Sequence, residues 1–550
     1  FEVDVTGAGA GTDYGCSLDG GPALPDPRSA WQPAGVHGPS RVVDHGAFRW
    51  TDGGWGGVHL PSAVLYELHV GTFTPEGTFD AAAGRLDHLV DLGVDAVELL
   101  PVAQFRGTRG WGYDGVDLYA PHTAYGGPDG LKRFVDACHA KGLGVVLDVV
   151  YNHLGPDGNH LAAYGPYFTD RYATPWGQAV NLDGAGSDEV RAFFVDNALM
   201  WLRDYHVDGL RLDAVHAIVD TSATHLLEEL AQAVAELAAA TGRPRFLIAE
   251  SDLNDPRVVR RCEVGGYGMD AQWSDDFHHA LHAALTGERD GYYADFGALG
   301  QVATALRRAF VYAGDYSPAR HRVHGRLDPG LPGHRFLGYA QNHDQVGNRA
   351  LGERSSALMS AGRLRIAAAL VLTAPFVPML FQGEEWGATT PFQYFTDHTE
   401  PALAAAVREG RRAEFAAFGW KPDEVPDPQD EATFQRSKLD WGEARRGDHA
   451  ALLDWHRRLV ELRRAVPALR DGRLDRVRCQ VDEDAGWLVV QRGPVTVAAN
   501  VGPGPVELDA PGRLVLASEG VTAGQRPLCL PSDSVAVLVV PEEPGAGRTA

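Results

Sequence analysis

The sequence of 550 residues predicts an α/β protein: a (β/α)8 TIM barrel with a partial N-terminal β-sandwich domain and a C-terminal β-sandwich domain. Eight short apolar runs recur along the middle of the chain, and such runs are typical of strands buried on both faces of a parallel sheet. Helix-like stretches separate these runs, as in a barrel of alternating strands and helices. The two ends of the chain lack helical periodicity and carry short β-type runs instead.

Residues 1–57 are expected to form the N-terminal β domain, because they are rich in Gly, Pro and Asp and show no helical periodicity. The chain begins at Phe1, without a methionine and within a predicted strand. We therefore expect an upstream part of this domain to be missing from the sequence.

The barrel is predicted to occupy residues 58–468. Its strands are expected to end in polar residues at one rim, where barrel enzymes place their active sites. The eight predicted strands are Val64–Val70, Ala96–Val102, Gly144–Val150, Gly209–Asp213, Arg245–Glu250, Met269–Trp273, Arg335–Gln341 and Phe376–Phe381.

Amphipathic stretches between these runs predict the helices of the barrel. Gly93 and Gly142 end the first two, as glycine often does after a last helical turn. The clearest predicted helices are Thr78–Leu92, Pro128–Lys141, Glu189–Tyr205, Ser222–Ala240, Ala357–Leu372 and His449–Ala465.

Two connections are too long for plain barrel loops. The segment at about 154–188 is expected to be a small inserted subdomain, and residues 387–443 an elaborated loop after the eighth strand. Short β-runs return from residue 469 and predict the C-terminal β-sandwich over 469–542. The tail at 543–550 is expected to be disordered.

The composition excludes several classes of function. Lys and Arg number 49 against 73 Asp and Glu, a net charge of −24, so the chain lacks the basic surface that nucleic acids or anionic membranes require. No apolar run reaches the ~18 residues of a membrane helix. Five scattered cysteines without a CxxC pair argue against a disulfide framework or a thiolate zinc site. We expect a cytoplasmic protein that needs no cofactor and no metal.

Polar side chains gather where the predicted strands end, while the opposite rim has no comparable group. This concentration predicts an active site at the carboxyl ends of the strands. In chain order the rim residues include Asp148, Asn152, His153, Arg211, Asp213, His216, Glu250, Asp252, Asp275, Asp276, His278, His279, His343, Asp344, Gln345, Glu384 and Glu385.

Three of these acids form a pattern that suits glycoside hydrolysis, which needs one ionised carboxylate and one carboxylic acid across the scissile bond. Arg211 lies two residues before Asp213, so both point the same way and the guanidinium should lower the pKa of the Asp213 carboxyl. Glu250 follows an apolar run that should raise its pKa and suit a general acid. Asp344 is placed to support positive charge on the sugar ring.

Less specific interpretations stay open for other rim residues. Asp148 is expected to be a structural carboxylate and Asn152 a loop cap rather than a metal ligand. His278 and His279 are adjacent on one element, so we favour hydrogen bonds to substrate over shared metal binding. Stacking on sugar or a place in the core is equally open for three aromatic residues, Trp111, Tyr113 and Trp386.

Four short motifs occur in order: Asp148-Val-Val-Tyr-Asn-His153, Gly209-Leu-Arg-Leu-Asp-Ala-Val-His216, Ala249-Glu250 and Gln341-Asn-His-Asp344. Their combination is highly specific, and the chain resembles the α-amylase family of glycoside hydrolases. The resemblance implies that Asp213 is the nucleophile, Glu250 the acid/base and Asp344 the transition-state stabiliser. It also implies sugar contacts at the cleavage point from Tyr113, His153, Arg211 and His343.

Further segments resemble those family members that cleave the α-1,4 bond next to the terminal trehalose of an α-1,4-glucan and release trehalose. The segments are Asn152–Asn159, Ala249–Asp255, Trp273–His279, Gln341–Arg349 and Gly383–Phe392. The residues after the sixth strand are expected to recognise the bend of trehalose. Substrate contacts implied by the resemblance, beyond those already named, are His216, Asp275, Asp276, His278, His279, Gln345, Asn348 and Trp386.

Other functions remain as alternatives. A glycogen branching enzyme uses the same covalent intermediate but transfers the glycosyl unit to a sugar hydroxyl, and another α-amylase-type glucan hydrolase is also open. A glucan-binding protein on an inactive barrel belongs to a different class. The intact Asp213, Glu250 and Asp344 argue against it.

Overall fold

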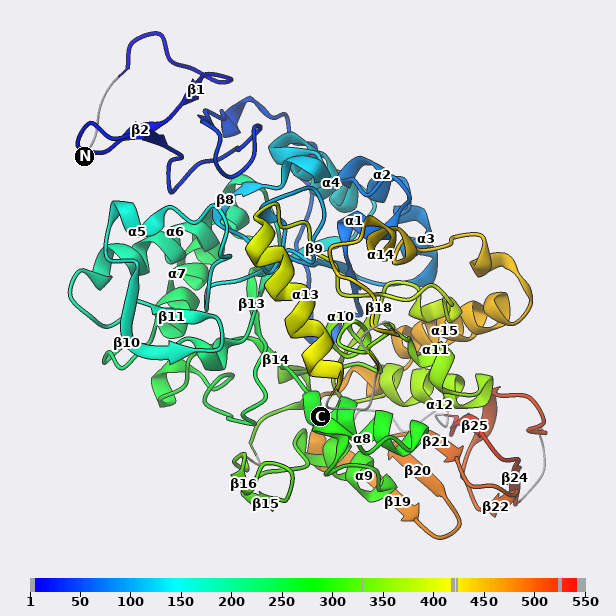
Figure 1. Ribbon diagram of the computed structural model, residues 1–550. Coiled ribbons are helices and arrows are strands. Elements are labelled where there is room, and N and C mark those ends of the chain that lie inside the picture. Colours follow the sequence, from blue (N-terminus) through cyan, green and yellow to red (C-terminus); the bar gives the residue numbers. More distant parts are fainter. Residues whose placement is uncertain (1–4, 329, 417–420, 422–423, 523–526, 542–550) are drawn as a thin grey trace.

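A closed parallel barrel of eight strands forms the centre of the computed structural model, which describes residues 5–328, 330–416, 421, 424–522 and 527–541 (Figure 1). The strands follow the chain around the barrel, and the last pairs with the first. All eight predicted strands are present. They are β5 (Leu65–Leu68), β6 (Ala96–Leu99), β9 (Gly144–Val149), β12 (Gly209–Leu212), β13 (Phe246–Ala249), β14 (Ala271–Trp273), β17 (Phe336–Gly338) and β18 (Val377–Phe381).

The inward side chains of the barrel form two layers, because every second residue of a strand points to the same side. The lower layer is apolar and includes Leu65, Ala96, Val146 and Ile248. Two residues further along these strands the inward positions become polar, as at Glu67, Glu98, Asp148 and Glu250. The candidate site therefore lies on a packed apolar floor.

Helices cover the outside of the barrel, and several differ from their predicted limits. Predicted helix 78–92 is broken into two pieces at Gly84, whose N–H bonds back to the turn before it. The principal helices are α2 (Phe79–Ala83), α3 (Leu86–Leu92), α4 (Gly127–Ala140), α6 (Ser187–Asp204), α7 (Leu226–Thr241), α8 (Asp275–Thr286), α9 (Leu299–Arg308), α12 (Ala361–Leu372), α13 (Pro401–Ala416), α14 (Glu431–Arg436) and α15 (Gly447–Ala465).

Short helices and hairpins fill the loops at the carboxyl ends of the strands. The insertion after β9 contains α5 and an antiparallel hairpin, β10–β11. A second hairpin, β15–β16, follows α9. Their bounds are α1 (Val70–Phe73), β7 (Ala103–Gln104), β8 (Asp117–Pro121), α5 (Leu161–Tyr164), β10 (Phe168–Thr174), β11 (Gly177–Val180), β15 (Asp315–Ser317), β16 (Arg322–His324), α10 (His343–Gly347) and α11 (Ser355–Leu358).

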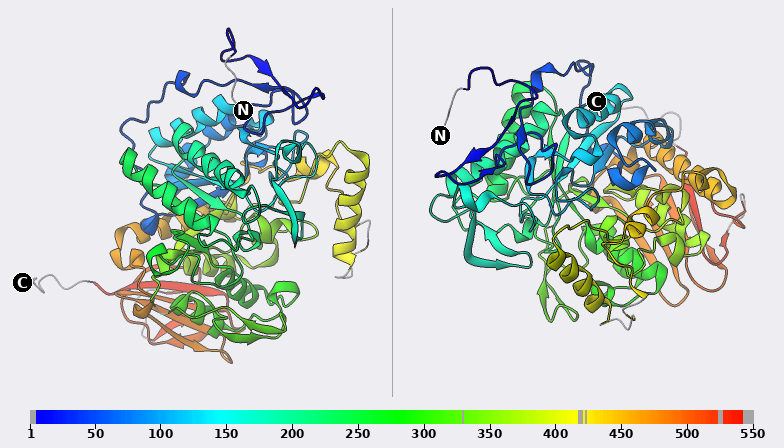
Figure 2. Two further views of the ribbon diagram at one scale, coloured as in Figure 1. Left: turned by 90° about the vertical axis from the view of Figure 1, so that its left-hand side faces the viewer. Right: turned by 45° about the horizontal axis from the view of Figure 1, so that its top comes forward.

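The N-terminal segment and the C-terminal β domain lie at opposite ends of the molecule (Figures 1 and 2). The N-terminal segment contains two pairs of two-residue strands, β1 with β4 and β2 with β3. The C-terminal domain has a five-stranded antiparallel sheet of β19, β20, β21, β25 and β23, and a pair formed by β22 and β24. The predicted tail at 543–550 lies outside the described residues.

The bounds of these terminal strands are β1 (Asp13–Tyr14), β2 (Cys16–Ser17), β3 (Ala23–Leu24), β4 (Ser40–Arg41), β19 (Val477–Asp482), β20 (Trp487–Arg492), β21 (Val495–Asn500), β22 (Val506–Leu508), β23 (Arg513–Ala517), β24 (Leu528–Leu530) and β25 (Ser534–Val539). In the part of the chain that the structure describes, no helix combines the length and the apolar character needed to span a membrane.

Candidate active site

One buried arginine brings the predicted acids together. Arg211 points inward from β12, and its guanidinium lies 4.2 Å from the centre of the Trp273 ring. Its Nη1 donates to Asp148 at 2.6 Å and to Asp213 at 3.1 Å, and its Nη2 lies 3.3 Å from a Glu250 oxygen. The two carboxyls that the sequence analysis paired, Asp213 and Glu250, therefore contact opposite ends of one guanidinium.

The backbone after β12 connects the same two acids. Ala214 adopts a left-handed conformation, with φ 39° and ψ 51°, which is costly for a residue with a Cβ. This turn directs the Ala214 N–H to a Glu250 oxygen at 2.6 Å. Asn152 donates its side-chain amide to the other Asp213 oxygen at 3.1 Å. The amide of Asn152 thus orients Asp213.

Burial raises the pKa of two acids of the site, Glu250 and Asp148. Removal from water raises the pKa of Glu250 well above its usual range. Arg211 opposes this effect, while Asp213, Asp344 and Asp275 reinforce it. A carboxylic acid that keeps its proton at neutral pH can donate it to a leaving group. Burial likewise raises the pKa of Asp148, to about 7, against the opposing effect of Arg211.

His343 and Tyr113 form a second contact group at the site. The Tyr113 hydroxyl lies 2.6 Å from Asp148 and 2.7 Å from Nε2 of His343, and the two rings stack with centres 5.2 Å apart. Asp344 is more open, with 37% of its side chain exposed, and one of its oxygens lies 3.5 Å from Nε2 of His343. Tyr113 and His343 are thus neighbours of the Asp148–Arg211 pair.

Sequence reasoning missed Trp176, which lies in the turn between β10 and β11. Its ring stacks on His153 with centres 4.4 Å apart and planes 5° from parallel, and 47% of the residue is exposed. His153 also bonds the Tyr113 carbonyl at 3.0 Å. A tryptophan at the tip of a long insertion after a rim strand was the available signal, because such loops build barrel active sites.

The structure places the residues after β14 in the first turns of α8. Asp276 is buried and accepts hydrogen bonds from the backbone N–H groups of Val311 and Tyr312 and from Asn254. It anchors the backbone at 311–312. All three hydrogen bonds go to one oxygen of Asp276, and its direct contact with substrate stays a prediction.

The histidines of α8 are also packed. His278 is fully buried, stacks on Tyr339 and bonds the Tyr293 hydroxyl at 3.0 Å, and its contact with substrate stays a prediction. His279 is 6% exposed and stacks on Tyr292, which is 46% exposed. His279 supports an exposed tyrosine. Asp275 differs from its neighbours because it is half-buried and bonds the Tyr339 hydroxyl.

Trp386 is a further correction. It has no exposed surface and packs edge-on against His88, with Trp441 on another side. Glu385 beside it is equally buried and bonds His88 and the Tyr66 hydroxyl. A substrate cannot reach this ring without repacking the helices around β18, so Trp386 belongs to the core.

The remaining predicted residues lie on exposed or half-buried turns. His216 is exposed in the turn after Ala214, and Gln345 is half-buried in α10. Asn348 is exposed, and its amide lies 3.4 Å from Asp344. In the described residues, no three or more His, Cys, Asp or Glu side chains are grouped to hold a metal ion.

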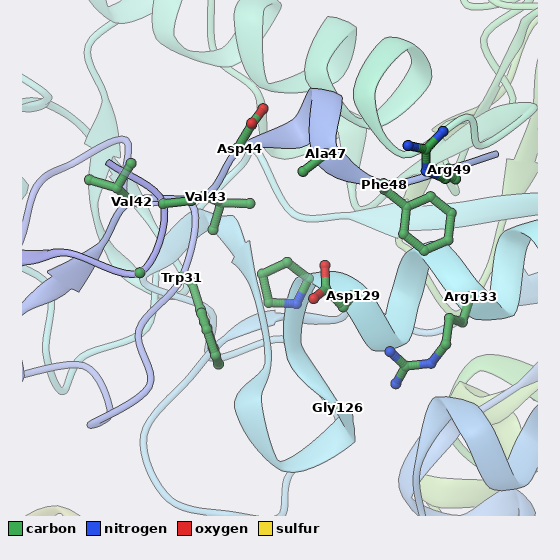
Figure 3. Close-up of a pocket in the computed structure, with 13 residues that line it drawn as sticks. Trp31, Val42, Val43, Asp44, Ala47, Phe48, Arg49, Gly126, Asp129 and Arg133 are labelled. Carbon is green, nitrogen blue, oxygen red and sulfur yellow. The ribbon is translucent and has the colours of Figure 1, made fainter. Parts of the chain in front are cut away.

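A pocket of about 430 Å³ lies elsewhere, between the N-terminal segment and the first turns of α4 (Figure 3). Trp31 and Phe48 line it with Asp129, and none of the three candidate catalytic acids takes part. Its position on the outside of the barrel separates it from the chemistry described above.

Comparison with known proteins agrees with this geometry. The family "Alpha amylase, catalytic domain" matches residues 47–164, and a domain of unknown function, DUF3459, matches residues 472–537. An alpha amylase candidate from Salmonella typhimurium has a crystal structure that superposes with a TM-score of 0.91 at 42% identity, over 98% of this chain and 92% of that one. A pullulanase from Paenibacillus barengoltzii shares the fold at 20% identity, with a TM-score of 0.66 over 94% of this chain and 84% of the pullulanase.

Curated relatives are more specific. Malto-oligosyltrehalose trehalohydrolase from Arthrobacter ramosus is 57% identical over 96% of this chain and 91% of its own length. The enzyme of the same name from Mycobacterium tuberculosis is 54% identical over 96% and 92%, and that from Saccharolobus solfataricus 44% over 94% and 88%. The chain therefore belongs to the malto-oligosyltrehalose trehalohydrolase family, within the α-amylase-type glycoside hydrolases.

Proposed function

We propose that this glycoside hydrolase cleaves the α-1,4 bond next to the terminal trehalose of malto-oligosyltrehalose and releases trehalose. The observation that carries the proposal is near full-length identity of 44–57% to relatives named for that reaction. The cluster of Asp213, Glu250 and Asp344 around Arg211 and His343 supplies the groups that the reaction needs.

The proposed chemistry is a double displacement with retention. An Asp213 oxygen attacks the anomeric carbon while the bond to the glycosidic oxygen breaks, and Glu250 gives its proton to that oxygen. The oxygen of a water molecule then bonds to the anomeric carbon while Glu250 takes a proton from that water, and the bond between the sugar and Asp213 breaks. Arg211 and Asn152 hold the nucleophile in place, and burial keeps Glu250 protonated for the first step.

The remaining site residues are proposed to bind the substrate. Asp344 faces the sugar and stabilises its developing positive charge, and Tyr113, His153, Arg211 and His343 contact the ring at the cleavage point. Residues on the open side of the site are proposed to contact the leaving trehalose. These are His216, Asp275, Gln345 and Asn348, and Tyr292 joins them as the exposed ring that His279 supports.

The decisive experiment offers the purified protein malto-oligosyltrehalose and, separately, a plain malto-oligosaccharide of equal length. We expect free trehalose from the first and much slower release of reducing sugar from the second. The Asp213→Asn variant is the control for a contaminating hydrolase. Equal hydrolysis of both substrates would replace the proposal with a general α-glucan hydrolase.

Branching of glucan is the second candidate function. A 1,4-alpha-glucan branching enzyme from Pseudoalteromonas atlantica is 31% identical over 284 residues, or 44% of this chain. Transfer requires a sugar hydroxyl in place of water as the acceptor. New α-1,6 linkages in glucan incubated with the protein, without free trehalose from the first substrate, would favour this candidate.

We also propose a division of the chain into an N-terminal domain at 1–57, a catalytic domain at 58–468 with an insertion at about 154–188, and a C-terminal domain at 469–542. The hydrogen-bonded barrel from β5 to β18 and the antiparallel sheet that starts at Val477 support these limits. A cytoplasmic location is proposed from the five cysteines, none of which is paired.

A further inference from the structure

Glu67 contacts both the backbone and the side chain of His343. Its carboxylate points into the barrel from β5, two residues beyond the apolar floor residue Leu65. One oxygen accepts the backbone N–H of His343 at 3.0 Å, and the other lies 2.6 Å from Nδ1 of the same residue. Both side chains are at most 2% exposed. A single buried carboxylate thus fixes the main chain and the ring of one residue.

This contact decides which way the imidazole presents its second nitrogen. With Nδ1 donating to Glu67, Nε2 faces the Tyr113 hydroxyl at 2.7 Å and an Asp344 oxygen at 3.5 Å. The ring cannot swing away, because Tyr113 stacks on it and Trp111 meets it edge-on, with centres 5.7 Å apart. Nε2 is therefore held beside the Tyr113 hydroxyl and next to Asp344, whose side chain is 37% exposed.

We propose that Glu67 is a positioning residue for the reaction: it holds His343 as a charged donor whose Nε2–H binds a hydroxyl of the sugar at the cleavage point. This inference rests on the proposed function, because it requires a sugar beside Asp344. Glu67 itself touches no substrate and acts through His343. Neither the sequence motifs nor the predicted rim residues include it.

The charges around His343 support a protonated ring at neutral pH. Burial alone would lower the pKa of His343, but the Asp344 and Glu67 carboxylates raise it to about 9. The charged form is therefore present below about pH 9 and is lost as the pH rises through that value. The other titratable groups that face the ring are His69, Glu98, Tyr113 and Arg211.

Glu98 provides a matched control. It lies directly opposite Glu67 in the register of β5 and β6, and it is equally buried. Burial, reinforced by Glu67, raises the pKa of Glu98 well above its usual range. Glu67 bonds the backbone and the ring of His343, and Glu98 makes neither of these two contacts. Glu98→Gln therefore changes a buried carboxyl of the same layer, whereas Glu67→Gln removes the carboxylate that holds His343.

The test measures kcat and KM for malto-oligosyltrehalose from pH 5 to pH 10. We expect Glu67→Gln to lower kcat/KM at pH 7 by about 10- to 100-fold, as expected when a charge-assisted contact is lost. The alkaline fall in activity should move to lower pH by at least about one unit, towards the ordinary pKa of histidine. Glu67→Asp should restore the alkaline limb with a partial loss of rate, and Glu98→Gln should behave as the unmodified protein does.

An unchanged alkaline limb in Glu67→Gln, or an equal shift in Glu98→Gln, would overturn the positioning role. Circular dichroism checks that the variants fold. If Glu67→Gln does not fold, Glu67→Asp decides: a wild-type rate and limb in that variant would also overturn the role. Asp213→Asn is assayed in parallel, so that a failure of the proposed function can be distinguished from a failure of the role of Glu67. If the parent releases trehalose and Asp213→Asn does not, the proposed function holds. If Glu67→Gln then shows the same alkaline fall in activity as the parent, only the positioning role of Glu67 is wrong.

Discussion

At the scale of single residues, the alternation of side chains along a barrel strand determines which residues face the site. Gly209, Arg211 and Asp213 are spaced by two, so the same inward side of β12 carries a glycine at the floor, the guanidinium in the middle and the proposed nucleophile at the rim. A shift of one residue would bury Leu212 there instead and turn Arg211 outward. The ion-pair cluster therefore depends on register as much as on residue type.

The first prediction concerns the nucleophile. Asp213→Asn should lower kcat by at least about a thousandfold, because an amide cannot form the covalent intermediate. The fold should persist, since Asn keeps the shape and accepts the hydrogen bond from Arg211. Trehalose release, measured by chromatography, checks the rate. The surface variant Asp196→Asn is the control, since its carboxylate pairs only with half-exposed Arg28. Normal turnover by Asp213→Asn would disprove the assigned role.

The second prediction concerns the distance between two of the candidate acids. The Asp213 and Glu250 carboxyls should be ~5–5.5 Å apart, as in retaining glycosidases. Their shared contact with Arg211 agrees with close spacing. A crystal structure with a bound glucan measures this distance, and a separation of ~9 Å would leave room for a water and point to inversion.

A third prediction separates two adjacent acids of α8. Asp275 is half-buried beside the site, and burial raises its pKa to about 7, whereas Asp276 anchors the backbone at 311–312. Asp275→Asn should change the ratio of kcat/KM between malto-oligosyltrehalose and plain malto-oligosaccharide by about 5- to 100-fold, the effect of one unpaired buried donor or acceptor.

Asp276→Asn is the matched variant, and it should lower the melting temperature while leaving that ratio unchanged. Measuring kcat/KM on both substrates and the melting temperature of each variant tests this assignment. The opposite pattern, with selectivity lost in Asp276→Asn alone, would support the expectation that the sequence first suggested for this residue.

The grouping of the candidate acids could be predicted because a motif lies at or shortly after a strand end at Asp213, Glu250 and Asp344. Trp386 shows why other residues were not: a tryptophan after a strand fits a sugar platform or a core position equally well, and only packing against His88 decides. Trp176 was missed because its stacking on His153 joins residues 23 positions apart within the connection between β9 and α6. Its place at the tip of a long insertion pointed to this site, but the stacking partner has no local sequence signal.

At the scale of elements, the strands were easier to predict than the helices. Continuous apolar runs identify buried parallel strands directly, and all eight were found. Helix limits depend on capping: Ser360 accepts the N–H of Arg363 and starts α12 four residues later than periodicity suggests. No helix was predicted directly after β14, because the polar residues there hide the start of α8. Their side chains are satisfied by neighbouring elements.

The fourth prediction concerns how the N-terminal segment attaches to the barrel. One oxygen of buried Asp52 accepts hydrogen bonds from His139, His206 and Arg243 at 2.8–3.1 Å. Burial alone would raise the pKa of Asp52, but these donors lower it to about 2. The ionised carboxylate thus stabilises the fold above about pH 3.8, and this stabilisation is lost as the pH falls towards 2.

Asp52→Asn should lower the free energy of unfolding at pH 7 by about 1–3 kcal/mol, as for a buried hydrogen bond to a charged group. Urea unfolding at pH 7, 5 and 3.5 should show the difference from the parent shrinking at the lowest pH. The exposed Asp44, whose side chain caps only the N–H of Gly46, provides the control variant Asp44→Asn. A difference that is constant with pH would rule out the ionised carboxylate as the cause.

At the scale of the whole molecule, two buried arginines hold the connection between α12 and β18, and one of them, Arg492, joins it to the C-terminal domain. Arg463 on α15 donates to the carbonyls of Leu372, Ala374 and Phe376, which end α12 and lead into β18. Arg492 on β20 donates to Thr373 in the same connection and to Leu469 and Asp471 before the C-terminal sheet. Two guanidinium groups thus satisfy carbonyls that would otherwise be buried without partners.

This arrangement predicts that the C-terminal domain stabilises the barrel without entering the site. Arg492→Met keeps the apolar stem but removes three hydrogen bonds to carbonyls, so it should lower the free energy of unfolding by about 3–5 kcal/mol. Below its melting temperature the variant should keep kcat and KM, because the acid cluster lies at the carboxyl ends of the strands whereas Thr373 precedes β18. Arg513→Met, on exposed β23, is the control and should melt as the parent does. A loss of kcat in the folded Arg492 variant would show that the two domains are coupled through β18, whose far end leads into the turn that carries Glu384 and Glu385.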